Sequence, residues 1–252
     1  MSDLKQAAQR ALAALDLTNL EDDCTAEDVR DLCARASTPH GTTAAVCIWP
    51  KYVSVAKTAL SGGTVRIATV VAFPGGDGAA ADIREMTGTA VSDGADEIDM
   101  VIPYKALIEG QSSLVPAAVA RVKDAAGTAQ VKAILETGIL VEPDLIRQAA
   151  TLAVEGGADF IKTSTGKVPV NATPEAARIM LEVIEASGGQ VGLKAAGGVR
   201  TTQDALRYLD LCDEIMGDGW ATPRHFRIGA SSLLAVLLAT LDGTDAAPAE
   251  GY

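Results

Sequence analysis

A lysine stands at the end of a short apolar segment, where its amine could act as a nucleophile. Lys162 follows Ala158-Asp-Phe-Ile and precedes the small-residue stretch Thr163-Ser-Thr-Gly-Lys. If residues 158–162 form a buried strand, burial lowers the pKa of this lysine, because its charged form loses hydration. A neutral amine attacks carbonyl carbons and forms a Schiff base. The alternative is a lysine whose amine simply extends from a strand end into water.

Two other apolar segments also carry a charged residue near their ends. Asp99 stands in Ile98-Asp-Met-Val, and Lys194 ends Val191-Gly-Leu-Lys. A second ammonium close to Lys162 would disfavour the protonated form of that lysine by like-charge repulsion. Asp99, together with water, could move protons while a carbinolamine loses water and an α-carbon is deprotonated. In the alternative interpretation, Asp99 only forms a structural salt bridge to one of the lysines.

Glycines and hydroxyl residues follow the last three strand-like segments. They occur in Ser164-Thr-Gly-Lys, Ala196-Gly-Gly-Val and Gly229-Ala-Ser-Ser. Glycine lets backbone N–H groups approach an anion closely, and a helix that begins at the serine pair would favour phosphate at its N-terminus. Glycine pairs are also common in plain turns. We predict a phosphate site made by Gly166, Lys167, Gly197, Gly198, Ser231 and Ser232.

These residues require a scaffold that gathers strand ends, and the hydrophobic pattern supplies one. Strand-like segments alternate with helical ones along the chain, which predicts a single (β/α)₈ barrel over residues 1–252, with an additional N-terminal helix in residues 1–14 and a mobile tail in residues 243–252. An open doubly wound sheet would show a glycine fingerprint after its first strand, and Leu17-Thr-Asn-Leu-Glu-Asp has none. The eight expected strands are residues 15–18, 44–49, 65–71, 97–102, 130–135, 158–162, 191–194 and 226–228.

The active site of such a barrel lies at the C-terminal ends of its strands. Polar residues expected there, besides the three already described, are Asp16, Cys47, Lys132 and Glu136. We expect Asp16, Cys47 and Thr165 to line the substrate pocket, with Cys47 acting as a small apolar thiol rather than an activated nucleophile.

Composition excludes several classes of partner. The 252 residues are 48% hydrophobic, enough for one large core, and the formal net charge of −12 argues against nucleic acid and anionic membrane surfaces. Four scattered cysteines and two histidines support neither a zinc site nor a disulfide framework. The start of the chain has no hydrophobic signal core, and no run of about 18 apolar residues occurs. We therefore expect a cytoplasmic protein that needs no metal.

From residues 15 to 252 the chain resembles 2-deoxy-D-ribose-5-phosphate aldolases, which are class I aldolases with a (β/α)₈ fold. The blocks that carry this resemblance are Gly94-Ala-Asp-Glu-Ile-Asp-Met-Val-Ile-Pro-Tyr, Glu136-Thr-Gly, Ala158-Asp-Phe-Ile-Lys-Thr-Ser-Thr-Gly and Gly197-Gly-Val-Arg. The resemblance implies Lys162 as the Schiff-base lysine, Asp99 as the proton relay and Lys194 as the second lysine, and it implies the same phosphate-binding glycines and serines.

Two further features bear on this resemblance. Some family members use a C-terminal tyrosine for proton transfer, which would be Tyr252 here. Members with that tyrosine often read Lys-Pro-Ala-Gly-Gly after the second lysine, whereas this chain reads Lys194-Ala-Ala-Gly-Gly and so lacks the proline that restricts the backbone there.

The implied reaction is the reversible cleavage of 2-deoxy-D-ribose 5-phosphate to acetaldehyde and D-glyceraldehyde 3-phosphate, without metal or organic cofactor. The expected partners are sugar phosphates and aldehydes, with a homodimer as one option for assembly. Two alternatives stay open: a class I aldolase or transaldolase-like barrel for another sugar phosphate, and a non-enzymatic phosphate-ligand sensor.

Overall fold

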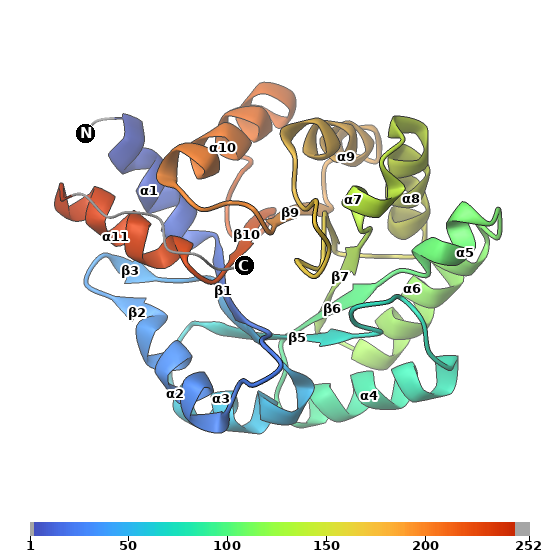
Figure 1. The fold of residues 1–252 in the computed structure, drawn as a ribbon, viewed down its shortest axis with the longest axis horizontal. Coiled ribbons are helices and arrows are strands. Elements are labelled where there is room, and N and C mark those ends of the chain that lie inside the picture. Colours follow the sequence, from blue (N-terminus) through green and yellow to red (C-terminus); the bar gives the residue numbers. More distant parts are fainter. Residues whose placement is uncertain (1–2, 245–252) are drawn as a thin grey trace.

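Eight parallel strands close into a barrel that is surrounded by helices (Figure 1). The computed structural model of the chain describes residues 3–244. A closed barrel confirms the predicted (β/α)₈ fold and excludes the open doubly wound sheet. In barrel order the strands are β1 (Leu15–Asn19), β4 (Ala45–Ile48), β5 (Arg66–Val71), β6 (Glu97–Val101), β7 (Gln130–Ile134), β8 (Phe160–Lys162), β9 (Gly192–Ala196) and β10 (Phe226–Ala230), which pairs with β1.

A helix or helical pair follows every barrel strand and covers its outer face (Figure 1). The expected additional helix, α1 (Asp3–Ala13), packs against α10 (Thr202–Met216) and α11 (Leu233–Asp242). Among residues 3–244, no helix has the length and apolar character needed to span a membrane. The remaining helices are α2 (Ala26–Arg35), η1 (Pro50–Tyr52) with α3 (Val53–Ala59), α4 (Ala80–Ser92), α5 (Tyr104–Ile108) with α6 (Leu114–Ala126), α7 (Thr137–Leu140) with α8 (Pro143–Glu155), and α9 (Pro174–Ala186).

Local sequence explains where several helices begin. Thr25 and Thr201 each form a capping box with the aspartate three residues later, and Thr173 caps α9 with Pro174 at its first position. A threonine hydroxyl at this position accepts a hydrogen bond from a backbone N–H that the helix leaves unpaired. The loops that leave the barrel are therefore ended by residues that fix the start of the following helix.

Some boundaries differ from the sequence prediction. Strand β9 continues to Ala196 instead of ending at Lys194, and β10 continues to Ala230 instead of ending at Ile228. The hairpin of β2 (Ser37–Thr38) and β3 (Gly41–Thr42), and the short helices α5 and α7, were not predicted, because elements of two to five residues are too short to show a period. Gly243 ends α11 in a left-handed conformation, and residues 245–252 of the expected tail lie outside the described chain.

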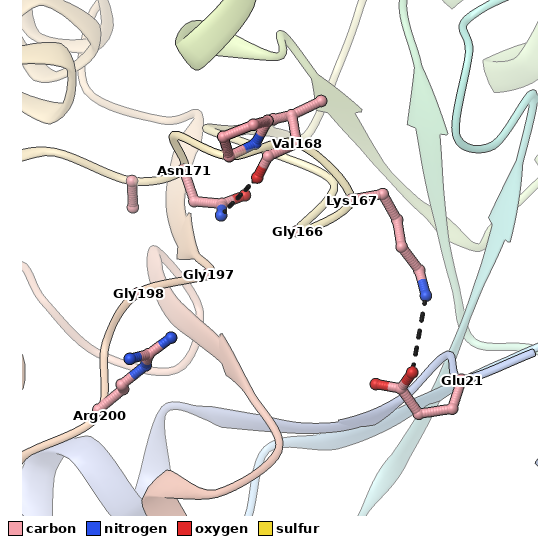
Figure 2. Close-up of a pocket in the computed structure, with 10 residues that line it drawn as sticks. Glu21, Gly166, Lys167, Val168, Asn171, Gly197, Gly198 and Arg200 are labelled. Atoms are coloured by element: carbon pink, nitrogen blue, oxygen red, sulfur yellow. Dashed lines mark hydrogen bonds and ion pairs between the residues drawn. The ribbon is translucent and has the colours of Figure 1, made fainter. Parts of the chain in front are cut away.

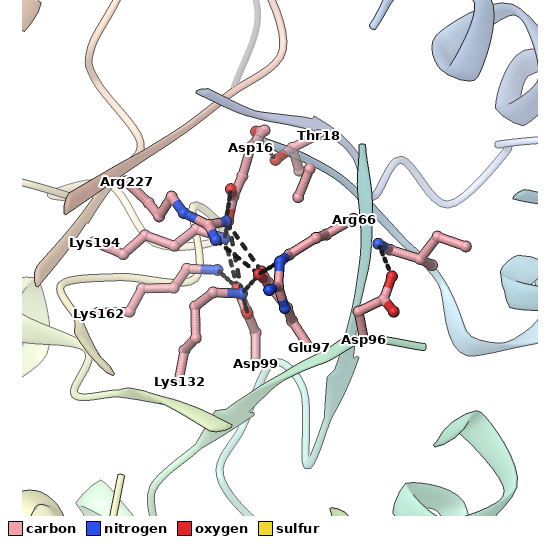
Figure 3. A network of polar contacts seen from close by, with 12 residues as sticks. Asp16, Thr18, Arg66, Asp96, Glu97, Asp99, Lys132, Lys162, Lys194 and Arg227 are labelled. Carbon is pink, nitrogen blue, oxygen red and sulfur yellow. Dashed lines mark hydrogen bonds and ion pairs between the residues drawn. The ribbon is translucent and has the colours of Figure 1, made fainter. Parts of the chain in front are cut away.

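The inside of the barrel is divided into an apolar and an ionic part. One buried cluster joins Ala45, Cys47, Ala68 and Val70 of the neighbouring strands β4 and β5. Side chains of β1, β6, β7, β8, β9 and β10 fill the other part with charges (Figure 3). Successive residues of a strand point to opposite faces, so every second residue of these strands enters the barrel. The charged residues are Asp16, Glu97, Asp99, Lys132, Lys162, Lys194 and Arg227.

Candidate active site

Ion pairs to a single carboxylate bring three buried lysines together inside the barrel. Lys132 on β7 lies beside Asp99 on β6, and Lys162 on β8 lies beside Lys194 on β9. Each of these four side chains is at most 1% exposed. The structure therefore brings together the three residues that the sequence singled out, Asp99, Lys162 and Lys194, and adds Lys132 to them.

The carboxylate of Asp99 is the centre of this group (Figure 3). Its Oδ1 accepts a hydrogen bond from Lys132 Nζ at 2.8 Å. Its Oδ2 accepts from both Lys162 Nζ, at 2.9 Å, and Lys194 Nζ, at 2.7 Å. The amines of Lys162 and Lys194 thus share one oxygen atom, which places them next to each other.

A second set of ion pairs supports the first. Lys194 Nζ lies 2.6 Å from Asp16 Oδ2, and Arg227 donates to Asp16 Oδ1 at 2.7 Å and to Glu97 Oε1 at 2.7 Å. Glu97 Oε2 in turn lies 2.5 Å from Lys132 Nζ. Asp16 is therefore buried inside this network and bonds to Lys194.

The sequence analysis did not select Glu97 or Arg227. Glu97 precedes Asp99 by two residues, so the alternation of a strand places both on the inner face. Arg227 stands between two apolar residues in the predicted strand at residues 226–228. A charged residue in an otherwise apolar strand was the feature that could have identified it as part of the site.

The charges of the network balance if one of its four cations is neutral, and Lys162 is the one whose pKa is lowered. Arg66 lies 3.8 Å from Glu97, but its side chain is 50% exposed. Arg66 begins β5, at the end of the barrel opposite the C-terminal ends of the strands. Three negative charges then face three positive ones, and a neutral Lys162 leaves the dry interior without net charge, which is the less costly state in a low dielectric. The balanced groups are Asp16, Glu97 and Asp99 on one side, and Lys132, Lys194 and Arg227 on the other.

The pKa of Lys162 is lowered from its ordinary value. Burial is the main cause, the ammonium of Lys194 adds to it, and the carboxylate of Asp99 opposes both. The direction agrees with the sequence prediction, although burial contributes more than the neighbouring lysine does. Lys162 is the one lysine of the three whose pKa falls, because burial would also lower the pKa of Lys132 and Lys194 but their carboxylate partners raise it overall.

Asp99 remains ionised. Burial on its own would raise its pKa, but Lys132, Lys162 and Lys194 outweigh that effect and hold the pKa well below the ordinary value. A carboxylate held in this way is a weak base. It can fix the positions of the amines, but it keeps a proton only briefly.

Glu136 clamps the loop that follows Lys162. Its Oε2 accepts a hydrogen bond from Thr165 Oγ1 at 2.5 Å, and its Oε1 accepts from the backbone N–H of Thr165 at 3.1 Å. Glu136 itself has φ of 60°, a strained conformation for a residue with a side chain. Burial raises its pKa, while the bonds from Thr165 and the charge of Lys162 partly compensate. Thr165, expected in the pocket wall, therefore bonds to Glu136 and is buried.

A pocket of about 720 Å³ opens among the loops after β1, β8 and β9 (Figure 2). Figure 2 shows Lys167 and Arg200 reaching into it from opposite sides, with Lys167 Nζ 4.0 Å from Glu21. Arg200, which the sequence analysis did not select, forms no side-chain hydrogen bond or ion pair with any residue in 3–244. Backbone from both glycine stretches completes the wall, and the lining includes Gly166, Lys167, Asn171, Gly197, Gly198 and Arg200.

Glycine is required in this wall for both conformation and space. Gly197 has φ of 77°, and a Cβ atom built there would lie 2.7 Å from Cγ of Asn171. Gly198 has φ of 83°. Side chains are strained in this region, so the backbone can present itself to the pocket only as glycine.

The remaining expected site residues are not part of the wall of this pocket within residues 3–244. Ser231 and Ser232 follow β10 at the start of α11, and neither lines the pocket. Cys47 is fully buried where the apolar cluster borders the charged network. Burial raises the pKa of its thiol, and the nearby charges of Lys194 and Lys162 oppose that rise. Tyr252 lies outside the described residues.

The closed parallel barrel, with its pocket at the C-terminal ends of the strands, defines a (β/α)₈-barrel enzyme. The chain belongs to the DeoC/LacD family of aldolases, whose family model matches residues 10–239. The protein is therefore an aldolase, and the resemblance found in the sequence is confirmed.

Solved structures agree with this membership. A proposed deoxyribose-phosphate aldolase from Coccidioides immitis is 30% identical, with 93% of this chain and 86% of that chain covered and a TM-score of 0.82. A proposed deoxyribose-phosphate aldolase from Toxoplasma gondii is 25% identical, with 97% and 99% covered and a TM-score of 0.87. The deoxyribose phosphate aldolase from Aeropyrum pernix, a tetramer, is 26% identical, with 94% and 97% covered and a TM-score of 0.77.

Proposed function

We propose that this aldolase reversibly cleaves 2-deoxy-D-ribose 5-phosphate into acetaldehyde and D-glyceraldehyde 3-phosphate through a Schiff base on Lys162. The observation that carries the proposal is the hydrogen bond of 2.9 Å from Lys162 Nζ to Asp99 Oδ2, in a site where burial and Lys194 lower the pKa of Lys162. Related structures described as deoxyribose-phosphate aldolases support the choice of substrate.

In the first stage the neutral amine of Lys162 attacks C1 of the open-chain sugar and forms a carbinolamine. Loss of water gives a protonated imine. The C2–C3 bond then breaks as the C3 hydroxyl loses its proton, and the electron pair of that bond moves toward the iminium to form an enamine. The C3–C5 fragment leaves as glyceraldehyde 3-phosphate. Protonation of the enamine at C2, followed by hydrolysis of the imine, releases acetaldehyde and restores the amine.

We assign the neighbouring charges to electrostatic and proton-transfer roles. Lys194 keeps its charge, because Asp16 and Asp99 outweigh the effect of burial and raise its pKa. It thereby favours the neutral form of Lys162 and can donate a hydrogen bond to the carbinolamine hydroxyl. Asp99 holds both amines in place and passes protons to and from water, while Tyr252 stays a candidate for protonation of the enamine carbon.

The pocket after β8 and β9 is the proposed phosphate anchor. Lys167 and Arg200 supply two positive charges in a protein of net charge −12, and Gly166, Gly197 and Gly198 supply close backbone approach. Anchoring the phosphate would hold the aldehyde at the other end of the sugar near Lys162, which converts attack into an intramolecular step.

Trapping the imine tests this proposal directly. The protein is incubated with acetaldehyde and sodium borohydride, digested, and the added ethyl group is located by mass spectrometry. We expect it on Lys162, and we expect Lys162→Leu to be unlabelled and inactive while retaining the circular dichroism of the wild type. Labelling at Lys132 or Lys194 instead, or turnover by Lys162→Leu near the wild-type rate, would overturn the assignment.

A further inference from the structure

A second pocket lies at the opposite mouth of the barrel. Its volume is about 530 Å³, and its lining residues precede or begin the strands, whereas the residues of the first pocket follow them. The two pockets therefore open at opposite ends of the barrel. The lining comes from the end of α1, the segments before β4, β5 and β10, and the first residues of β5 and β7, and it includes Thr42, Thr64, Arg66, Gln130, Arg224 and Arg227.

This pocket concentrates positive charge in an acidic protein. Its lining includes three arginines, Arg66, Arg224 and Arg227. The lining contains no aspartate and no glutamate. The whole chain carries 33 acidic residues against 21 lysines and arginines. Asp16 and Glu97 pair with Arg227, but Arg224 has no carboxylate partner among residues 3–244 and Arg66 has only Glu97, at 3.8 Å. Such a cluster attracts anions.

Two of the three guanidinium groups have donors to spare. Within residues 3–244, the side chain of Arg224 forms no hydrogen bond or ion pair, and it is exposed. Arg66 comes no nearer to Glu97 than 3.8 Å, which is too long for a hydrogen bond, and its side chain is 50% exposed. Arg227 differs, because Pro223, Asp16 and Glu97 already accept its hydrogen bonds. Arg66 and Arg224 are therefore the groups available to a ligand.

We propose that the pocket binds a small phosphate-bearing anion through Arg66 and Arg224. A planar guanidinium donates two parallel hydrogen bonds to a phosphate, and two such groups match its double charge. The hydroxyls of Thr42 and Thr64 and the amide of Gln130 line the same pocket and add neutral donors. A volume of about 530 Å³ falls within the range of small-molecule sites.

The pocket serves binding rather than a second reaction. Its lining contains no lysine, cysteine, histidine or carboxylate that could act as a nucleophile or as a general acid or base. Lys162 is the last residue of β8 and lies toward the other mouth. The proposed ligand is therefore bound independently of the substrate, and this inference does not depend on the identity of the sugar that the enzyme cleaves.

Calorimetric titration with inorganic phosphate at low ionic strength tests the site. Arg200→Gln is the background variant, because it weakens phosphate binding at the first pocket. In that background the first pocket keeps Lys167 and binds phosphate more weakly, so we expect the tighter site to be the second pocket. Its affinity should fall roughly ten- to a hundredfold in the double variant Arg200→Gln/Arg224→Gln, as expected for the loss of a charge-assisted hydrogen bond. The matched control is Arg200→Gln/Arg30→Gln, because Arg30 is an exposed arginine on α2, away from both pockets.

Two outcomes would sink the inference: no phosphate site in the Arg200→Gln protein, or equal affinities in the two double variants. Titration with glycerol phosphate in the same variants compares a phosphate ester with free phosphate. The compound with the higher affinity for the second pocket indicates which of the two classes the site prefers. Arg224 is exposed and forms no side-chain hydrogen bond or ion pair within residues 3–244, so its substitution should leave the melting temperature unchanged. A scanning calorimetry trace checks that each variant is folded.

Discussion

Lys162 Nζ lies 2.9 Å from Asp99 Oδ2, although 63 residues separate the two along the chain. The same oxygen also accepts a hydrogen bond from Lys194 at 2.7 Å. One carboxylate therefore holds an amine whose pKa is lowered next to an amine whose pKa is raised, and most of the predictions below depend on that arrangement.

Replacing Asp99 removes the negative charge to which three buried lysine amines donate hydrogen bonds. We expect Asp99→Asn to lower kcat about 10²- to 10⁴-fold, because the proton relay is lost. We also expect the free energy of unfolding to fall by about 3–5 kcal/mol, because buried charges are left without their partner. Steady-state kinetics and urea unfolding measure the two effects. Asp31→Asn, at an exposed position of α2, is the control, and equal behaviour of the two variants would contradict the central role of Asp99.

The pH dependence of activity reports the charge of Lys194. This ammonium lowers the pKa of Lys162, so its removal raises that pKa and reduces the fraction of neutral amine at any given pH. In Lys194→Met we therefore expect the rise of kcat/KM with pH to move to higher pH, by about one unit or more. Lys51→Met, at an exposed lysine, should leave the profile in place. A profile that moves to lower pH in Lys194→Met would be incompatible with this role.

Glu136 makes stability depend on pH in a defined direction. Its pKa is raised in the folded protein above the ordinary value of about 4.5, so the folded state holds a proton that the unfolded state has already lost. Stability from this group is present below that value and is lost as pH rises through the folded pKa. Glu136→Gln cannot lose a proton. We expect this variant to lose less stability than the wild type between pH 5 and pH 8 in urea unfolding, and an unchanged difference would refute the prediction.

Gly229 on β10 leaves room for the side chain of Lys194. A Cβ atom at this position would lie 3.1 Å from Cε of Lys194 and 3.1 Å from Cβ of Ala196. We expect Gly229→Ala to displace the lysine, to lower kcat and to reduce stability by about 1–3 kcal/mol. The matched control is Gly88→Ala, because Gly88 lies inside α4 with open space around it, and alanine there should stabilise the helix by about 0.5–1 kcal/mol. Wild-type kinetics in Gly229→Ala would show that the lysine tolerates the shift.

The anchor pocket should distinguish phosphorylated from unphosphorylated sugars. For 2-deoxyribose 5-phosphate we expect Arg200→Gln and Lys167→Gln each to raise KM roughly tenfold or more, because each removes one charge-assisted contact. Neither variant should change kcat/KM for 2-deoxyribose, which has no phosphate. A parallel loss with both sugars would mean that these residues support the fold of the loops instead of binding phosphate.

Much of the fold could be predicted from the sequence, because the signals were local and repeated. All eight barrel strands were expected. The predicted strand at residues 191–194 ends two residues before β9 does, because a lysine is expected at the end of an apolar strand and not inside it. In the structure the buried charge lies inside the strand, where Asp16 and Asp99 compensate it.

The candidate site was only partly predictable for a similar reason. Asp99, Lys162 and Lys194 were recognisable as charges on apolar segments, and the structure brings them together. Glu97 and Arg227 belong to a deeper layer of the barrel that strand pairing creates, and pairing cannot be derived from one strand. Arg200 resembled any exposed arginine until the fold placed it across from Lys167.

The amines and the carboxylate all project from strands of a barrel that has no free edge. No hinge lies between them, and no single strand can detach without breaking the closed ring of hydrogen bonds on both of its sides. On heating, the enzyme should therefore lose activity in one step, and the activity that remains should follow the same temperature curve as the fraction of folded barrel.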